Sequence, residues 1–273
     1  VKFFAETCTQ YLTLNSHLLD QEKINDGAKW ICSPPIRSPS DSKALWIGLE
    51  DNTLDLVTSD HAPYSFDSNG KFFKGDNPNF KEIPNGMPGL QWRLPILLDK
   101  VINKNCDLDI LDFVRITSTM PAKVYGLYPS KGEIKIGSDA DITIWDTKLN
   151  ITLSDNMVVD GSKYNPYSGM NICCWPNEVI LRGNTIVKDN LIKSKPGSGK
   201  FLSTKLEPFL ISIEKPVPVI FDKTKVSPAC AFSIEIPIDG KAELAEILVP
   251  LLPVKNEFSK LTAFWEVPEA ITA

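Results

Sequence analysis

The chain has 273 residues, of which 42% are hydrophobic and 23% charged, and its formal net charge is −5. This composition is that of a globular protein long enough for one large domain or two small ones. The mild acidity argues against a nucleic-acid partner, because no basic surplus is available to neutralise phosphates. No apolar stretch approaches the roughly 20 residues that span a bilayer, and no secretory pattern is present. We therefore expect a cytoplasmic protein with no membrane partner.

The chain opens on the apolar, strand-like run Val1-Lys2-Phe3-Phe4, without an initiating Met. We interpret this start as a cut through the middle of a fold, with a processed terminus as the alternative. Six cysteines are present, at positions 8, 32, 106, 173, 174 and 230. None forms a CxxC pair, and adjacent cysteines do not suit an ordinary disulfide, so we expect reduced thiols.

The first half of the chain alternates strand and helix patterns. Residues 1–4 and 54–58 are expected to be strands, with a helix over residues 41–50 between them. Helical patterns return over residues 90–102 and 109–119. Strand, loop and helix in sequence predict the parallel β/α units of an α/β fold.

A long loop over residues 62–89, rich in Gly, Pro and Asn, follows the second expected strand. Connections longer than about 15 residues are usually functional or disordered. This loop begins at the C-terminal end of a strand, where the active sites of β/α barrels lie. It is therefore the first place to look for a site.

From Gly132 the pattern changes to antiparallel sheet. Residues 133–136 and 141–145 alternate polar and apolar side chains, and residues 178–181 and 185–187 flank a hairpin-like turn at Arg182-Gly183-Asn184. This pattern predicts a small sandwich. After residue 202, short β-like runs at 217–221 and 231–238 precede residues 241–252, which could form an amphipathic helix.

The residues best placed for chemistry are Ser59-Asp60-His61-Ala62-Pro63, at the end of the strand expected over residues 54–58. A carboxylate at the C-terminal edge of a barrel strand can bind a metal or act as a general base. On these five residues alone, an Asp that caps a turn and a His satisfied by the backbone is the simpler interpretation.

Several stretches together carry a family resemblance. Residues 5–12 (AETCTQYL), 32–37 (CSPPIR), 59–63 (SDHAP) and 83–89 (IPNGMPG) resemble motifs of the dihydropyrimidinase (hydantoinase) family of cyclic amidohydrolases, with Thr9 where Pro is usual. The match continues, in order, at residues 117–123, 131–141, 164–169 and 195–202. The resemblance thus covers about residues 1–202.

The resemblance implies an α/β fold: the C-terminal part of a TIM-like (β/α) barrel over residues 1–128, followed by a small antiparallel β-sandwich portion over residues 129–202. Residues 203–273 are left as an unassigned C-terminal extension. It also implies a cytoplasmic homotetramer in the complete protein.

The resemblance assigns roles to three residues. Asp60 matches the family's metal-binding aspartate, which also takes the proton of the attacking hydroxide and delivers it to the departing amide nitrogen. Ser33 and Asn85 match positions that hydrogen-bond the imide edge of the cyclic amide substrate. The implied cofactor is a binuclear metal centre, usually zinc, which activates a bridging hydroxide. His61 follows the metal-binding aspartate and is expected to support that ligand or to be structural, and His17 is expected to lie on the surface.

The family takes its remaining metal ligands from a His-x-His, a carboxylated lysine and two later histidines, all before the position of Ala5. This chain has two histidines in all, so we expect it to be inactive by itself. The implied activity is the ring opening of 5,6-dihydropyrimidines in pyrimidine breakdown, with hydantoins as the alternative substrates.

Two alternative functions are compatible with the resemblance. A non-catalytic relative of the collapsin-response-mediator type is disfavoured because Asp60, Asn85 and Gly86 are kept. A dihydroorotase or allantoinase is disfavoured by Ser33 and by the loop at residues 83–89.

Overall fold

The computed structural model describes residues 3–21 and 24–204, and the backbone of residues 220–221, 232–238 and 241–247. The chain forms two compact units, Val1–Leu206 and Glu207–Ala273. The finer divisions expected at residues 128 and 202 stay predictions.

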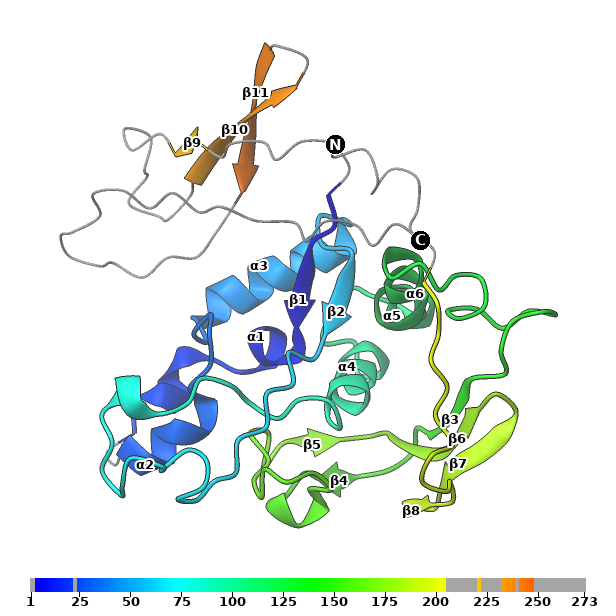
Figure 1. Ribbon diagram of the computed structural model, residues 1–273, viewed down its shortest axis with the longest axis horizontal. Helices are drawn as coiled ribbons and strands as arrows, with labels where there is room; N and C mark the ends of the chain where they lie inside the picture. Colours follow the sequence, from blue (N-terminus) through cyan, green and yellow to red (C-terminus); the bar gives the residue numbers. More distant parts are fainter. Residues whose placement is uncertain (1–2, 22–23, 205–219, 222–231, 239–240, 248–273) are drawn as a thin grey trace, which may run out of the picture. The chain divides into compact units, whose positions relative to one another are not determined.

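A short parallel sheet lies at the centre of the first unit (Figure 1). Strand β1 (Glu6–Cys8) pairs in parallel with β2 (Leu56–Thr58). The strand expected at residues 1–4 is wrong: residues 1–2 lie outside the described residues, and Phe3 is 58% exposed and not in a strand. The position of the strand is set by its pairing partner, because the hydrogen-bonded ladder with β2 begins at Glu6.

The crossover between these strands carries α3 (Pro39–Glu50), which confirms the expected helix. Its start is specified locally: Ser38 and Asp41 form a capping box, and Pro39 lies in the first turn, where its missing N–H is not needed. Parallel strands require a crossover of about a dozen residues or more, usually helical, and α3 meets that requirement. The β1–α3–β2 order confirms the predicted β/α pattern.

The other helical elements are α1 (Thr9–Thr13), η1 (Ser16–Leu19), α2 (Ile24–Gly27), η2 (Ala28–Trp30), η3 (Phe80–Glu82), α4 (Arg93–Ile102), α5 (Ile110–Val114), η4 (Arg115–Thr119), α6 (Met120–Val124) and η5 (Asp155–Met157). The helices expected near 90–102 and 109–119 are confirmed by α4 and by the run from α5 to α6. The middle of that run, η4, is a π turn. Pro121, which follows, has no N–H for the carbonyl of Thr117, so the regular α ladder is interrupted there.

An antiparallel sheet follows in the order β3-β6-β7-β8. Its strands are β3 (Ile142–Asp146), β6 (Trp175–Leu181), β7 (Asn184–Lys188) and β8 (Leu191–Ile192), and a separate pair joins β4 (Ile151–Thr152) to β5 (Asn171–Ile172). The β6–β7 hairpin turns at Arg182 and Gly183, whose φ values of 49° and 77° are typical of a two-residue hairpin. The expected hairpin is confirmed.

The strand expected at residues 133–136 is wrong. Ile134 is 84% exposed, Ile136 is fully exposed, and the segment pairs with no strand of the described chain. Gly132 and Gly137 bracket it with φ values of 89° and 98°, so the chain turns at both ends. A segment with an alternating pattern forms a strand only where another strand pairs with it and its apolar side chains are buried. Neither condition is met here.

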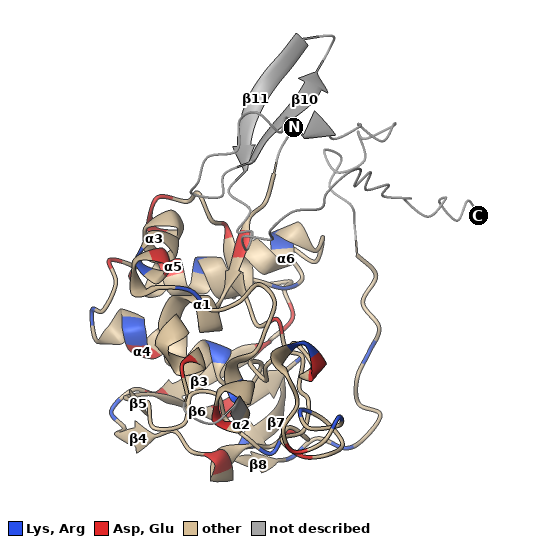
Figure 2. Cartoon of the chain, turned by 90° about the vertical axis from the view of Figure 1, so that its left-hand side faces the viewer, with Lys and Arg blue, Asp and Glu red and all other residues tan. Residues whose placement is uncertain are grey.

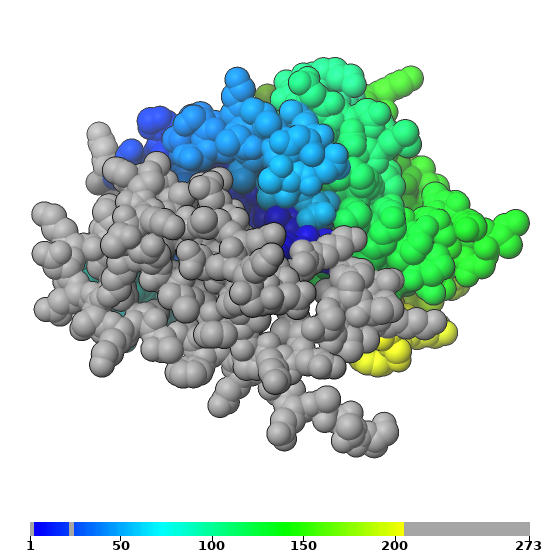
Figure 3. Space-filling view, turned by 90° about the horizontal axis from the view of Figure 1, so that it is seen from above, coloured from blue at the N-terminus to red at the C-terminus, as the bar shows by residue number. Residues whose placement is uncertain are grey.

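Two apolar clusters form the core of the first unit. Leu49 of α3 packs in one cluster with Leu97 of α4, and Figure 3 shows the light-blue α3 region beside the green segment that follows α4. Trp92 and Ile96 belong to the second cluster, with Cys32 and Met87. Helix α4 therefore joins both clusters and fixes the segments around residues 32 and 87.

In the second unit, β9 (Ile220–Phe221), β10 (Phe232–Ile238) and β11 (Lys241–Ile247) form an antiparallel sheet in the order β11-β10-β9. This confirms the expected β-like runs over residues 220–221 and 232–238; residues 217–219 and 231 lie outside the described residues. The helix expected over residues 241–252 is wrong for residues 241–247, which pair with β10 along its whole length; residues 248–252 lie outside the described residues. Long-range pairing overrides the helical pattern.

Acidic and basic residues are interspersed along the described elements (Figure 2). Across the same residues, no helix is both long and apolar enough to cross a membrane.

Candidate functional site

Asp60 lies just beyond the C-terminal end of β2 and is exposed. Its φ of 44° is in the left-handed region, which Asp tolerates better than most residues. Within the described chain its carboxylate has no hydrogen-bond or ion-pair partner. A carboxylate of this kind is free to hold a ligand or to exchange a proton.

His61, the next residue, is tied to the backbone. Its Nδ1 accepts hydrogen bonds from the backbone N–H groups of Gly89 (3.1 Å) and Leu90 (3.2 Å). His61 also pairs with Met87 as a parallel bridge, and the N–H of Ala62 donates to the Met87 carbonyl at 3.0 Å. These contacts agree with the structural role expected for His61. His17 is exposed, as expected.

Two glycines allow the loop at residues 83–89 to lie against the segment after β2. Gly86 has a φ of 146°, and a Cβ there would stand 2.6 Å from the Cβ of Ala62. A Cβ on Gly89 would stand 2.7 Å from the carbonyl oxygen of Ser59. Both positions therefore require glycine, so that the two backbones can approach closely.

The segment that carries Ser33 is joined to the same loop. The N–H of Gly86 donates to the carbonyl of Ile31 at 3.0 Å. Ser33 and Asn85 are both exposed. The structure thus brings together the three segments that carry Ser33, Asp60 and Asn85.

Three weakly acidic groups, Cys8, Tyr11 and Cys32, lie close enough to Asp60 for its charge to affect their pKa. Burial raises the pKa of the Cys8 and Cys32 thiols to about 11, and the charge of Asp60 contributes to the rise in both. Burial likewise raises the pKa of Tyr11, with smaller contributions from Cys32, Cys8 and Asp60. At neutral pH these groups are protonated, so neither thiol is a nucleophile.

Both thiols have local partners. Cys8 Sγ lies 3.2 Å from Thr58 Oγ1, and Cys32 Sγ donates to the Pro34 carbonyl at 3.3 Å. All five cysteines of the described chain are free, as expected, while Cys230 lies outside it.

A metal site is not completed by the residues that the structure describes. No group of three or more His, Cys, Asp or Glu side chains in them could hold a metal ion. A catalytic zinc needs about three protein ligands. Asp60 could serve as one.

The burial of Lys71 beside the site cannot be predicted from the sequence. It follows Asn69-Gly70 in the polar loop at residues 62–89, a context typical of an exposed lysine, yet its exposed fraction is 0%. Its Nζ donates to the carbonyls of Ile31 (3.1 Å) and Pro84 (2.7 Å), immediately beside the site. No local signal distinguishes it from the exposed Lys74.

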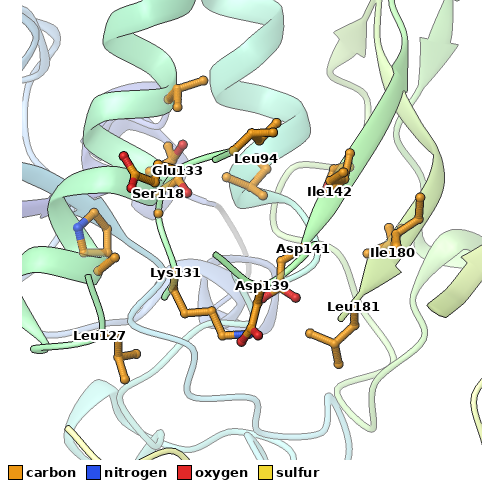
Figure 4. Close-up of a pocket in the computed structure, with 18 of the residues that line it drawn as sticks. Leu94, Ser118, Leu127, Lys131, Glu133, Asp139, Asp141, Ile142, Ile180 and Leu181 are labelled. Atoms are coloured by element: carbon orange, nitrogen blue, oxygen red, sulfur yellow. The ribbon is translucent and has the colours of Figure 1, made fainter. Parts of the chain in front are cut away.

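A cavity of roughly 540 Å³ lies elsewhere, between the α5–α6 run and the β3–β6 face (Figure 4). Its lining includes none of the three predicted site residues. Three of its charged groups are paired with one another: Lys131 pairs with Asp139 at 2.8 Å and with Asp141. Although burial opposes it, hydrogen bonding to these two carboxylates raises the pKa of Lys131. The cavity therefore has the character of an apolar groove beside a structural ion pair.

The family model that matches this chain is described as the amidohydrolase family and matches residues 6–186. A D-hydantoinase from Ralstonia pickettii is 36% identical over 205 residues, which cover 75% of this chain and 44% of the relative. A D-hydantoinase from Rhizobium radiobacter is 36% identical over 201 residues, which cover 74% of this chain and 43% of the relative.

Among solved structures, the dihydropyrimidinase from Brevibacillus agri matches with a TM-score of 0.70 and 35% identity, covering 75% of this chain and 44% of that chain. The L-hydantoinase from Arthrobacter aurescens matches with a TM-score of 0.60 and 27% identity, covering 70% and 41%. The chain spans less than half the length of the relatives that it matches.

Proposed function

Because the chain belongs to the amidohydrolase family, we propose that it carries part of the active site of a hydrolase that opens the ring of cyclic amides. The substrates proposed are 5,6-dihydropyrimidines, in pyrimidine breakdown, and hydantoins. The observation that carries the proposal is the hydrogen-bonded assembly of the segments bearing Ser33, Asp60 and Asn85, through Gly86 to Ile31 and through Ala62 to Met87.

Asp60 is proposed as the proton carrier. Amide hydrolysis requires a base for the attacking water and an acid for the departing nitrogen, which is a poor leaving group until it is protonated. A single carboxylate can accept the first proton and return it in the second step. The exposed and unpartnered carboxylate of Asp60 supports this role.

Ser33 and Asn85 are proposed to hold the ring. A cyclic amide presents alternating N–H and C=O groups, which call for paired acceptors and donors. Both residues are exposed beside backbone segments that are joined by the bond from Gly86 to Ile31. Side-chain and backbone atoms of these two residues are the proposed partners.

The amidohydrolase family is metal-dependent, and we propose zinc as the metal, with Asp60 as one ligand. The described residues do not fit a complete metal site, since they supply one assigned ligand where a catalytic zinc needs about three. The proton transfer at Asp60 and the hold on the ring are the parts of the chemistry that this chain supplies.

The fold is of mixed α/β type, similar to the amidohydrolases of known structure. We propose that β1, β2 and their helices belong to a TIM-like barrel and that the β3–β8 sheet belongs to a sandwich. A homotetramer and a cytoplasmic location complete the proposal. Sedimentation and cell fractionation of the full-length protein test these last two points.

The decisive experiment is Asp60→Asn in the full-length protein. Asn keeps the size of the side chain and cannot accept the proton, so kcat for dihydrouracil and for hydantoin is expected to fall by about 10²–10⁴-fold. Asp76→Asn, at another exposed aspartate of the same loop, is the matched control and is expected to keep normal turnover. Near-normal turnover by Asp60→Asn, with an unchanged melting temperature, would exclude the proton-carrier role.

A further inference from the structure

Lys71 is buried without a counter-ion. None of its surface is exposed, and no carboxylate pairs with it within the described chain. Burial of an ammonium group is unfavourable unless hydrogen bonds replace its water. Burial also lowers the pKa of Lys71 to about 8, while the neighbouring Cys32 acts in the opposite direction. A residue held in this way needs a structural or functional reason.

The two hydrogen-bond acceptors of Lys71 suggest that reason. Ile31, whose carbonyl lies 3.1 Å from Nζ, precedes Ser33 by two residues. Pro84, whose carbonyl lies 2.7 Å from Nζ, directly precedes Asn85. One ammonium group thus links the two segments that bear the proposed ring-binding residues.

The same Ile31 carbonyl also accepts the N–H of Gly86 at 3.0 Å. Its two lone pairs are therefore both used, one by Lys71 and one by the loop that follows Pro84. The three hydrogen bonds form a closed connection between the two segments. Loss of the ammonium removes two of the three and leaves two backbone carbonyls without that donor.

The backbone of Lys71 is fixed from outside the site. Its own N–H donates to the Ser65 carbonyl at 2.8 Å, in a turn where a Cβ on Gly70 would stand 2.0 Å from that oxygen. The N–H of Phe66 donates to the Ser162 carbonyl at 2.9 Å. This turn is held by contacts that involve neither Ser33 nor Asn85, so the lysine can impose a position on both.

We propose that Lys71 is a positioning residue, which sets the separation of Ser33 and Asn85 so that both can engage the edge of one cyclic amide. The inference rests on the proposed function of the site. Lys71 itself touches no substrate, because it is fully buried. Its removal should chiefly weaken substrate binding, since Asp60 follows β2 and is not among the groups that Lys71 contacts.

The test compares Lys71→Met with Lys74→Met in the full-length protein. Lys74 is exposed and three residues away, so it matches the chemical change without touching the site. Amide hydrogen exchange at Gly86 is expected to be at least 10-fold faster in Lys71→Met and unchanged in Lys74→Met. KM for dihydrouracil is expected to rise roughly 10- to 100-fold in Lys71→Met, with kcat changed less than about 3-fold, because misplaced binding groups lose substrate affinity.

Two further variants guard against a folding defect. Lys71→Arg keeps charged donors and is expected to recover much of the KM, whereas a merely space-filling role would favour Lys71→Met over Lys71→Arg. Lys71→Gln, which keeps a neutral donor, is expected to be intermediate and serves if Lys71→Met does not fold.

Unchanged exchange at Gly86 in Lys71→Met would overturn the inference, as would faster exchange with an unchanged KM. Failure of the wild-type protein to open either ring would instead refute the proposed function. The exchange at Gly86 then decides, by itself, whether Lys71 holds the two segments together.

Discussion

Gly86→Ala tests whether the close approach of the 83–89 loop to the segment after β2 is essential. Gly86 has a φ of 146°, which an L side chain rarely adopts, at a cost of about 1–3 kcal/mol. The new Cβ would also stand 2.6 Å from the Cβ of Ala62 and 2.8 Å from its carbonyl oxygen. Overpacking against backbone costs a further 1–3 kcal/mol or so. The sum is about 4 kcal/mol, or a drop in Tm of roughly 8–16 °C for a unit of this size.

Two other glycines separate these contributions in thermal unfolding. Gly75 has a φ of 111° but nothing within 4 Å of a new Cβ, so Gly75→Ala should lose about 1–2 kcal/mol through backbone strain alone. Gly161 has no contact within 4 Å and no left-handed φ, so Gly161→Ala should stay within about 0.5 kcal/mol of wild type. If the full-length protein has the proposed activity, its KM should also rise for Gly86→Ala, because Asn85 is displaced.

The reasoning would be refuted if Gly86→Ala unfolded at the same temperature as Gly161→Ala. A loss equal to that of Gly75→Ala would show that the backbone strain is real and that the contact with Ala62 relaxes freely.

Further outcomes are expected elsewhere in the molecule. Asp99 is 2% exposed, and its carboxylate accepts hydrogen bonds from the Cys173 N–H at 2.8 Å and from the Asn103 side chain. Asp99→Ala should therefore lower the free energy of unfolding, measured by urea titration, by about 2–4 kcal/mol. A loss below about 0.5 kcal/mol would contradict this role. Burial lowers the pKa of Lys71 from 10.5 to about 8, so between these pH values the unfolded chain holds a proton that the folded chain has released. Lys71 therefore contributes a rise in stability with pH in that window, of about 3 kcal/mol. The rise is measured as the difference between wild type and Lys71→Met, because the buried Cys8 and Cys32 thiols, whose pKa is raised to about 11, act in the opposite direction in both proteins. Because burial raises the pKa of Cys8 to about 11, iodoacetamide at pH 7.5 should leave this residue unmodified until the protein unfolds; rapid labelling of the native chain would count against the assignment. Purified residues 1–273 with added zinc should not hydrolyse dihydrouracil, because one assigned ligand cannot hold a catalytic metal; measurable turnover would show that other ligands of the chain complete the site.

The sequence by itself determined those features whose causes lie within a few residues. Ser38, Pro39 and Asp41 specify the start of α3 through local hydrogen bonds. Arg182-Gly183 specifies a hairpin because both residues can adopt a positive φ. The motifs around Ser33, Asp60 and Asn85 indicated the family because they occur along the chain in the same order as in its members. Their roles remain predictions.

The tertiary structure decided everything that depends on a partner distant in the chain. The first strand begins at Glu6 instead of Val1 because β2 offers its ladder there. Residues 133–136 are not a strand because no face of a sheet covers them, and residues 241–247 are one because β10 pairs with them. Lys71 is the clearest case: its neighbours in sequence predict an exposed side chain, but in the fold it is fully buried and donates to the carbonyls of Ile31 and Pro84, which are distant in the chain. The burial of a side chain depends on which distant segments pack around it. The local sequence therefore cannot predict it.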